Sequence, residues 1–258
     1  FSSDGHWVLF IAGGALRFVS SAGGTPQTLA DSAANTASWG AGGHVVYTVR
    51  RSLWMVSSNG GNRRHLAAPD SARGIYQYVN PFVLPGGDDA LVAMWSRDGL
   101  DSARIGIVSL RDGKVTDLGI RGTRPHYEAS GHVVFARGNG LIFAVPFSLR
   151  KRATTGPEML VVEKVRQNAN GATAFSVAQN GTLAYETGAS GSNQLMYVVD
   201  RSGAERHPLP EGTQKTDFGT RPVGLFAAIL VRQQVDVVRI RARRLFVLVH
   251  PLVHRADG

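Results

Sequence analysis

Three histidines recur at one position of an internal repeat, directly after a turn glycine, at His6, His44 and His132. Neutral imidazoles bind Zn²⁺, so a three-histidine metal site is the sharpest chemistry that these residues offer. Two further copies of the repeat place Asp88 and Thr182 at the same position. Equivalent positions in successive units are also spread apart and do not converge on one point. We therefore predict solvated turn residues and no metal site.

Carboxylates occur in pairs at Asp88 and Asp89 and at Asp98 and Asp101. Such pairs could act as acid and base, or bind Ca²⁺ through oxygen ligands. Exposed turn aspartates are the simpler interpretation. The sequence has no cysteine, which excludes a disulfide framework, a thiolate metal site and a cysteine nucleophile.

Two motifs suggest catalysis and are incomplete. Residues 188–191 read Gly-Ala-Ser-Gly, which lacks the spacing of the Gly-x-Ser-x-Gly elbow of α/β-hydrolases. Residues 217–219 read Asp-Phe-Gly, the Mg²⁺-binding triplet of protein kinases. A kinase also needs a Gly-rich loop, a Lys on its third strand and a His-Arg-Asp loop, and the sequence contains none of them. We predict that the chain is not itself an enzyme and uses no cofactor, although it could be a fragment of one.

The formal net charge of +9 is concentrated near one end. Residues 221–258 contain seven arginines and two aspartates, a net of +5, which leaves +4 for residues 1–220. The arginines of this segment alternate with Val, Ile and Leu, a pattern that does not favour sequence-specific nucleic-acid binding. The longest apolar runs are much shorter than the roughly 20 residues that span a bilayer. No basic stretch precedes an apolar one at the start, so no signal peptide is expected in these residues.

The elements that must position the polar residues come from a repeat. Its turn glycines at positions 5, 43, 87, 131 and 181 are separated by 38, 44, 44 and 50 residues. Each unit reads as a first strand, a Gly turn, a strongly apolar strand, a variable loop, a third strand, a tight turn and a short fourth strand. A period of about 40–50 residues with several short strands predicts four-stranded antiparallel propeller blades. Helical spacing is nearly absent, so the expected fold is an all-β propeller.

The units give approximate blade boundaries. Five blades are expected at residues 1–30, 37–70, 78–119, 122–165 and 174–210. Gly224 follows Gly181 by 43 residues, so residues 211–258 are predicted to form a degenerate sixth blade. The alternative is an atypical basic tail, because the usual turn residues are missing there.

Strand order predicts where a ligand would bind. Loops between second and third strands lie at one end of the ring, and they vary in length and charge while the opposite turns repeat. Loops on a rigid scaffold often carry function, so we predict the binding face at this end. Its candidate residues are Arg50, Arg51, Trp95, Arg97, Asp98, Arg137 and Asn139. Arginines can bind carboxylate or phosphate with two donors, although they could also serve only to solubilise these loops. Trp95 could instead be a half-buried core residue.

Several segments resemble a known repeat family. Residues 1–5, Phe-Ser-Ser-Asp-Gly, resemble the Phe-Ser-Pro-Asp-Gly turn of TolB-like, or WD40-like (PD40), propeller repeats. Residues 53–66 and 175–185 also resemble this family, and the resemblance covers about residues 1–210. The units look most like the propeller C-terminal to bacterial serine/threonine kinase domains. The resemblance implies a six-bladed ring, binding through loops at one end, no catalytic motif and a periplasmic or extracytoplasmic location.

These observations predict a non-catalytic module of a larger bacterial protein, such as a receptor-type kinase. Its expected partner is a protein, a peptide or a small molecule bound at one end of the ring. One alternative is the propeller of a prolyl-oligopeptidase-like hydrolase, which would control access to a catalytic domain outside this chain. A further alternative is a propeller with its own active site.

Overall fold

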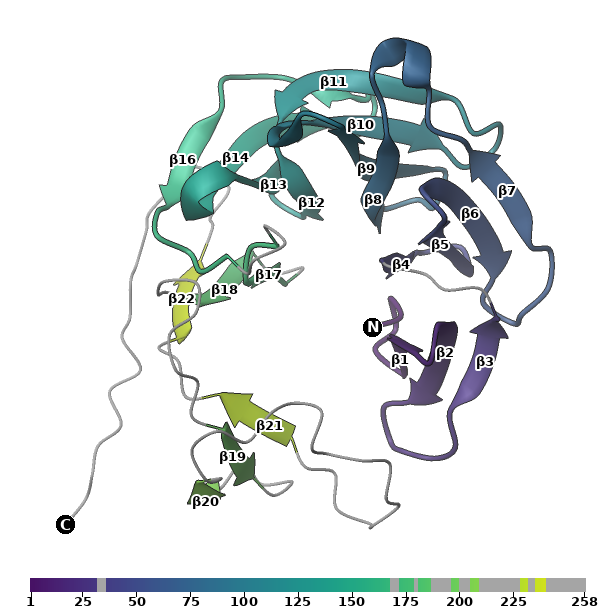
Figure 1. Ribbon diagram of the computed structural model, residues 1–258, viewed down its shortest axis with the longest axis vertical. Helices are drawn as coiled ribbons and strands as arrows, with labels where there is room; N and C mark the ends of the chain where they lie inside the picture. The colour runs from purple at the N-terminus through teal and green to yellow at the C-terminus, as the bar shows by residue number, and fades with distance from the viewer. Residues whose placement is uncertain are drawn as a thin grey trace.

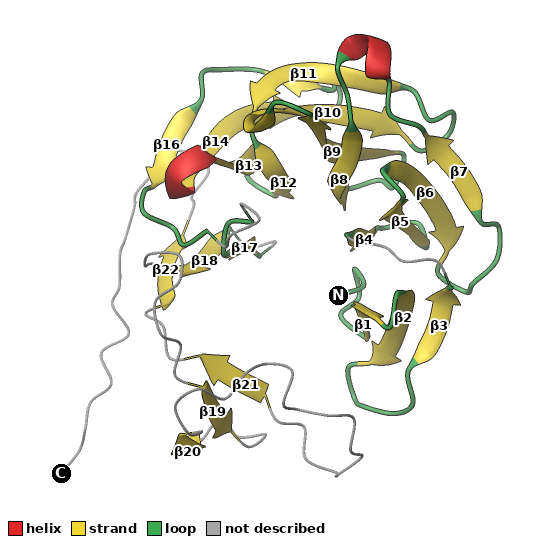
Figure 2. Cartoon of the chain, in the orientation of Figure 1, coloured by secondary structure: helices red, strands yellow, loops and turns green. Residues whose placement is uncertain are grey.

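A computed structural model describes residues 1–31, 36–167, 172–178 and 181–186, with four further strands at 196–199, 205–208, 228–231 and 235–239. Antiparallel sheets follow one another around a common centre (Figure 1), and strands dominate the described part of the chain (Figure 2). The helices described there are two single-turn 3₁₀ helices, η1 (Ser71–Arg73) and η2 (Gly138–Gly140). No helix in these residues is long and apolar enough to cross a membrane.

Two sheets have the four-stranded order expected of a propeller blade. The first contains β4 (Ala37–Trp39), β5 (His44–Val49), β6 (Ser52–Ser57) and β7 (Arg64–Ala67). The second contains β8 (Gln77–Val83), β9 (Asp89–Ser96), β10 (Gly99–Ser109) and β11 (Val115–Arg121). In both, chain order equals spatial order, with the first strand innermost (Figure 1). The repeat read from the sequence is therefore confirmed as a strand pattern.

The next sheet extends this pattern with one additional short strand. It contains β12 (Thr123–Glu128), β13 (His132–Arg137) and β14 (Leu141–Ser148). Both β15 (Ala153–Thr154) and β16 (Met159–Val162) pair with β14.

The sheet at the start of the described chain has three strands, β1 (Trp7–Ala12), β2 (Ala15–Ser20) and β3 (Gln27–Ala30). The Ser2 N–H donates to the Trp7 carbonyl, as the Leu84 N–H does to that of Asp89 just after the inner strand β8. Phe1 therefore lies where an inner strand would end. No strand among the described residues pairs with the inner edge of β1.

Strand pairing after residue 174 differs from the simple repeat. The second strand of the fifth unit, β18 (Thr182–Glu186), pairs with β17 (Phe175–Val177) and with β22 (Val235–Arg239). The expected third strand, β19 (Met196–Val199), pairs instead with β20 (Glu205–Pro208) and β21 (Ala228–Val231). Residues 235–239 read Val-Asp-Val-Val-Arg, and their β-branched residues favour such an added strand.

Other sequence motifs near this end, at 188–191 and 217–219, lie outside the described residues. Whether the rest of the 211–258 segment completes the ring therefore stays a prediction.

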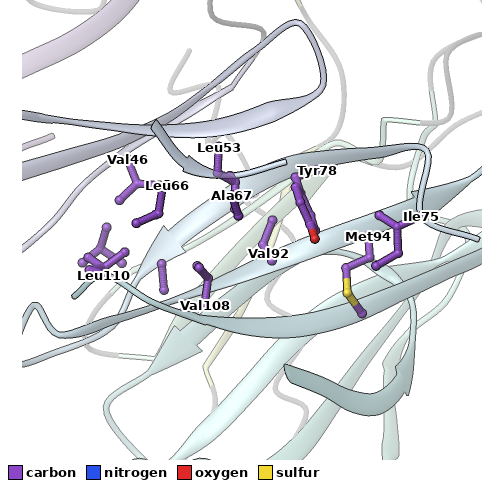
Figure 3. Packing of buried hydrophobic residues seen from close by; sticks show 12 residues of the cluster. Val46, Leu53, Leu66, Ala67, Ile75, Tyr78, Val92, Met94, Val108 and Leu110 are labelled. Atoms are coloured by element: carbon purple, nitrogen blue, oxygen red, sulfur yellow. The ribbon is translucent and has the colours of Figure 1, made fainter. Parts of the chain in front are cut away.

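The core consists of apolar layers between neighbouring sheets. Figure 3 shows one layer, in which Val46, Leu53 and Leu66 of one sheet face Val92 and Val108 of the next. Separate buried clusters lie between the following sheets and between the first two. Because each layer joins two sheets, adjacent units hold their loops in fixed relative positions.

Arg64 also joins two sheets. Its guanidinium donates to the carbonyls of Leu110 and Arg111, and the Nη1–O distance to Arg111 is 3.0 Å. Hydrogen bonds from a charged donor contribute about 1.5–3 kcal/mol each, and less where water competes. We expect Arg64→Met to lower the free energy of unfolding by about 1–2 kcal/mol, measured by urea denaturation. Arg111→Met removes the same charge and keeps the accepting carbonyl, so an equal loss there would contradict this role.

Candidate binding site on the loop face

The turn between β5 and β6 consists of Arg50 and Arg51, which follow the last paired residues of that hairpin. Both have positive φ, +45° and +79°. The corresponding turn between β1 and β2 consists of Gly13 and Gly14, with φ of +57° and +75°. Such two-residue turns favour Asn-Gly or Gly-Gly, because a side chain strains this conformation by about 1–2 kcal/mol per residue. The second unit therefore holds two arginines where the backbone favours glycine.

The ring of Tyr76 lies between this turn and the next sheet. The Cζ atom of Arg51 is 3.9 Å from the ring centroid, and that of Arg97 is 4.7 Å from it. Tyr76 precedes β8, and its N–H donates to the Trp95 carbonyl at 2.7 Å. A cation within about 6 Å of an aromatic ring is attracted by its negative face. The Tyr76 ring thus attracts two guanidinium groups, and their positions beside it do not require an ion pair with a carboxylate.

A cavity of about 480 Å³ contains these side chains. We call it the arginine pocket, and it is lined by Arg50, Arg51, Pro69, Ser71, Gly74, Ile75, Tyr76, Arg97 and Asp98. The Asp98 carboxylate accepts a hydrogen bond from Ser96 Oγ at 3.2 Å. Three cations and one anion give the lining a net charge of +2.

The arginines of the pocket differ from others in the described part of the chain. Five arginines there form ion pairs with carboxylates, namely Arg73, Arg104, Arg137, Arg152 and Arg166. Among the same residues, no carboxylate forms an ion pair with Arg50, Arg51 or Arg97. Their donors remain available for an anionic ligand.

Of the seven residues expected at the binding face, the structure brings Arg50, Arg51, Arg97 and Asp98 together and leaves the other three outside the pocket. Arg137 pairs with Glu158 at 2.5 Å, and its Cζ lies 4.4 Å from the Phe143 ring centroid.

The remaining two candidates, Trp95 and Asn139, also lie outside the lining of the pocket. Asn139 has φ +61° inside the 3₁₀ turn η2. The indole Nε1–H of Trp95 is buried without a hydrogen-bond partner, and only the Trp95 backbone supports the pocket.

Sequence reasoning missed the wall formed by the link between β7 and β8, including Tyr76. Asp70 caps the turn η1, because its carboxylate accepts from the N–H groups of Ala72 at 3.1 Å and Arg73 at 3.3 Å. Gly74 ends the turn with φ +72°. An Asp followed by a Gly four residues later is a signal for such a capped turn, and it was readable in the sequence.

The opposite end of the ring has a larger hollow. A chamber of about 1070 Å³ is lined mainly by inner strands and Gly turns, and its lining contains no Asp, Glu, Lys or Arg. Its large apolar residues include Leu9, Ile11, Trp39, Phe82 and Tyr127. Part of the space adjoins β1, where the other sheets have an inner strand. We favour the charged pocket as the binding site, because it brings together four of the residues expected at the binding face.

His126 of β12 lines this chamber between two rings, 5.1 Å from Phe82 and 5.5 Å from Phe175. The residue is partly exposed, but its Nδ1 atom is buried and has no hydrogen-bond partner. Burial, and to a smaller extent the positive charge of Arg124, lower the pKa of His126 to about 4. The imidazole is therefore neutral at pH 7.

The lowered pKa of His126 predicts a pH-dependent stability. In the unfolded chain His126 binds a proton below about pH 6.5, whereas in the folded chain it does so only near the lowered pKa. The free energy of unfolding is therefore highest above about pH 6.5, and it decreases as the pH falls towards 4. The upper bound on this loss is about 3 kcal/mol. We expect His126→Phe to flatten this part of the profile, measured by urea denaturation across that range. Equal slopes for both proteins would contradict the assignment, since other groups titrate alike in both.

Of the repeated histidines, His6 lies in a turn, whereas His44 and His132 are the first residues of β5 and β13, directly after their turn glycines. The His6 N–H donates to Asp4 Oδ1 at 2.9 Å, and His132 Nδ1 lies 2.8 Å from Ser130 Oγ. Ser130 also contacts Glu128, whose Oε1 accepts the Ser130 N–H at 2.9 Å. These bonds lock local turns. Within the described ranges, no three His, Asp or Glu side chains gather where they could hold a metal ion.

Comparisons with known proteins show the fold. No family model matches the sequence, and no relative is found among curated proteins. A solved structure described as TolB from Agrobacterium tumefaciens matches with a TM-score of 0.60 at 13% identity, covering 98% of this chain and 78% of that one. TolB from Acinetobacter baumannii matches with 0.53 at 16%, covering 92% and 61%. The calcium-binding protein regucalcin from A. tumefaciens matches with 0.54 at 14%, covering 81% and 71%.

At these identities, the likeness establishes the architecture alone. The chain has a TolB-like β-propeller fold, which confirms the fold class expected from the repeat. The arginine pocket is described from the residues of this chain alone, and the comparisons do not bear on it.

Proposed function

We propose that the chain is a non-catalytic β-propeller interaction module that binds an anionic segment of a partner protein in the arginine pocket. The observation that carries this proposal is the strained turn of Arg50 and Arg51. Backbone strain that glycine would relieve is often kept where side chains are needed for function. Arg51 and Arg97 contact one ring, and no carboxylate in the described part of the chain pairs with either of them, which supports an anionic ligand.

We further propose that this module belongs to a larger bacterial protein and acts outside the cytoplasm, as the sensing part of a receptor-type serine/threonine kinase. Support comes from the resemblance of the repeat units, including residues 140–147, to the propellers that follow kinase domains of that class. The TolB-like fold is compatible with it.

A peptide selection tests the binding site. A library of random displayed peptides is selected on the intact chain, and the affinities of enriched peptides are then measured by calorimetry. We expect acidic peptides whose affinity falls at least about tenfold in the double variant Arg51→Ala/Arg97→Ala, because each lost contact with a charged group is worth about 1.5 kcal/mol or more. The control Arg150→Ala/Lys151→Ala removes the same charge from an exposed hairpin.

Two results decide the question. Retention of full affinity by the control, with loss in the pocket variant, supports the proposal. Enriched peptides that bind both variants as tightly as the original chain would overturn it.

A further inference from the structure

We infer that the arginine pocket recognises a phosphoryl group carried by a protein segment, in preference to a side-chain carboxylate. This inference rests on the proposed function, because it names the ligand of the same site. It begins from the number of donors in the pocket and from their net charge.

The donors of the pocket exceed what one carboxylate can accept. Each guanidinium has five N–H donors in a planar fork, and one carboxylate is already matched by a single arginine that binds both of its oxygens. Three arginines without a described carboxylate partner line this pocket, Arg50, Arg51 and Arg97. A phosphoryl group has three strong acceptor oxygens, so it can engage more than one guanidinium at once.

The net charge supports the same ligand. With Asp98 included, the lining carries three positive charges and one negative charge. A phosphorylated side chain carries a charge of about −1.5 to −2 at neutral pH, which nearly balances the net positive charge of the lining. A Glu or Asp side chain carries a single negative charge and balances only half of it. Asp98 is the group that should oppose any anion, and its carboxylate is held by Ser96.

Geometry keeps the guanidinium groups together before a ligand arrives. Arg51 and Arg97 both contact the Tyr76 ring, so their Cζ atoms are no farther apart than the sum of the two ring distances. Arg50 adjoins Arg51 in the same two-residue turn. A preformed cluster loses less side-chain freedom on binding.

A local cluster fits a phosphorylated residue better than a nucleic-acid strand. A phosphodiester carries one negative charge, and proteins bind single strands along basic grooves with stacked aromatic rings over several nucleotides. In this pocket, the Tyr76 ring is already approached by two arginines.

Three peptides of one neutral sequence test the inference, with phosphoserine, glutamate or serine at the centre. Calorimetry with the full chain is expected to show phosphoserine binding at least about tenfold tighter than glutamate at neutral pH. The phosphoserine affinity should also rise severalfold between about pH 5 and 7.5, because the second phosphoryl pKa is about 6. The glutamate peptide should show little change, since both its carboxylate and the arginines stay charged over this range.

Variants assign the effect to the pocket. Arg51→Ala and Arg97→Ala should each weaken phosphoserine binding about tenfold or more, and Arg150→Ala should leave it unchanged. Asp98→Asn should strengthen it, because the opposing charge is removed while the side-chain shape is kept.

Several outcomes would overturn the inference. One is that the phosphoserine and glutamate peptides bind with equal affinity and without pH dependence. A second is that none of the three peptides binds measurably. A third is that a single-stranded oligonucleotide binds more tightly than the phosphoserine peptide and that its binding depends on the same arginines. Equal affinity for the two anionic peptides would leave the proposed function standing. Failure of acidic peptides to respond to the pocket arginines would remove the proposed function as well.

Discussion

Gly113→Ala is expected to lower the free energy of unfolding by about 3 kcal/mol or more. Gly113 lies in the turn between β10 and β11 with φ +76°, and an added Cβ would lie 1.9 Å from the carbonyl oxygen of Leu66. Leu66 belongs to β7 of the neighbouring sheet, so the clash is with backbone that cannot move without separating two blades. Urea denaturation with a circular-dichroism signal measures the loss.

Gly60→Ala is the matched control for this prediction. Gly60 also has positive φ, +89°, but an added Cβ there would meet nothing within 4 Å. Its cost is therefore the conformational strain alone, about 1–2 kcal/mol. If the two variants lose the same free energy of unfolding, the clash with Leu66 adds nothing to the cost of Gly113→Ala, which would contradict the prediction.

Replacing Arg50 and Arg51 together by Asn and Gly is expected to stabilise the chain and to weaken binding strongly. Asn-Gly suits a turn in which both residues have positive φ, and the relief of strain exceeds the lost cation–π contact with Tyr76. The net gain should be about 1 kcal/mol in the free energy of unfolding. Affinity for a pocket-binding peptide should fall about a hundredfold, because two charged donors are lost.

Two variants separate strain from charge at this turn. Arg50→Ala/Arg51→Ala removes the charges but keeps side chains at positive φ, so binding should be lost without any gain in stability. Gly13→Asn changes the corresponding turn of the first sheet to Asn-Gly and should leave binding unchanged. A less stable Asn-Gly variant with full affinity would contradict the account of the turn.

The positions of Arg50, Arg51, Arg97 and Asp98 were predictable because they occupy equivalent turns of adjacent repeat units. Apolar layers bring such turns together on the same side of the ring. Tyr76 was not predictable in this way. It comes from the irregular link before β8, and its role depends on distances in space that no repeat encodes.

Other features could not be predicted because they depend on competition between partners. Arg137 has the residue type and turn position of a ligand-binding arginine, yet Glu158 and the Phe143 ring bind its side chain. The pairing of β22 with β18 likewise depends on which strand reaches an open edge, and sequence spacing favoured β19. The apolar chamber could not be found either, because its lining comes from inner strands of several units.

Hydrogen exchange on the intact chain, with and without a selected acidic peptide, tests the central claim most directly. The account predicts that the peptide slows exchange at the backbone amides of residues 50–51, 74–77 and 97–98, around the arginine pocket. Amides at the opposite end, in the turns near residues 2–5, 85–87 and 129–131, should exchange as they do in the free chain. Protection of those turns together with unchanged exchange around Tyr76 would place the ligand in the apolar chamber and contradict the account.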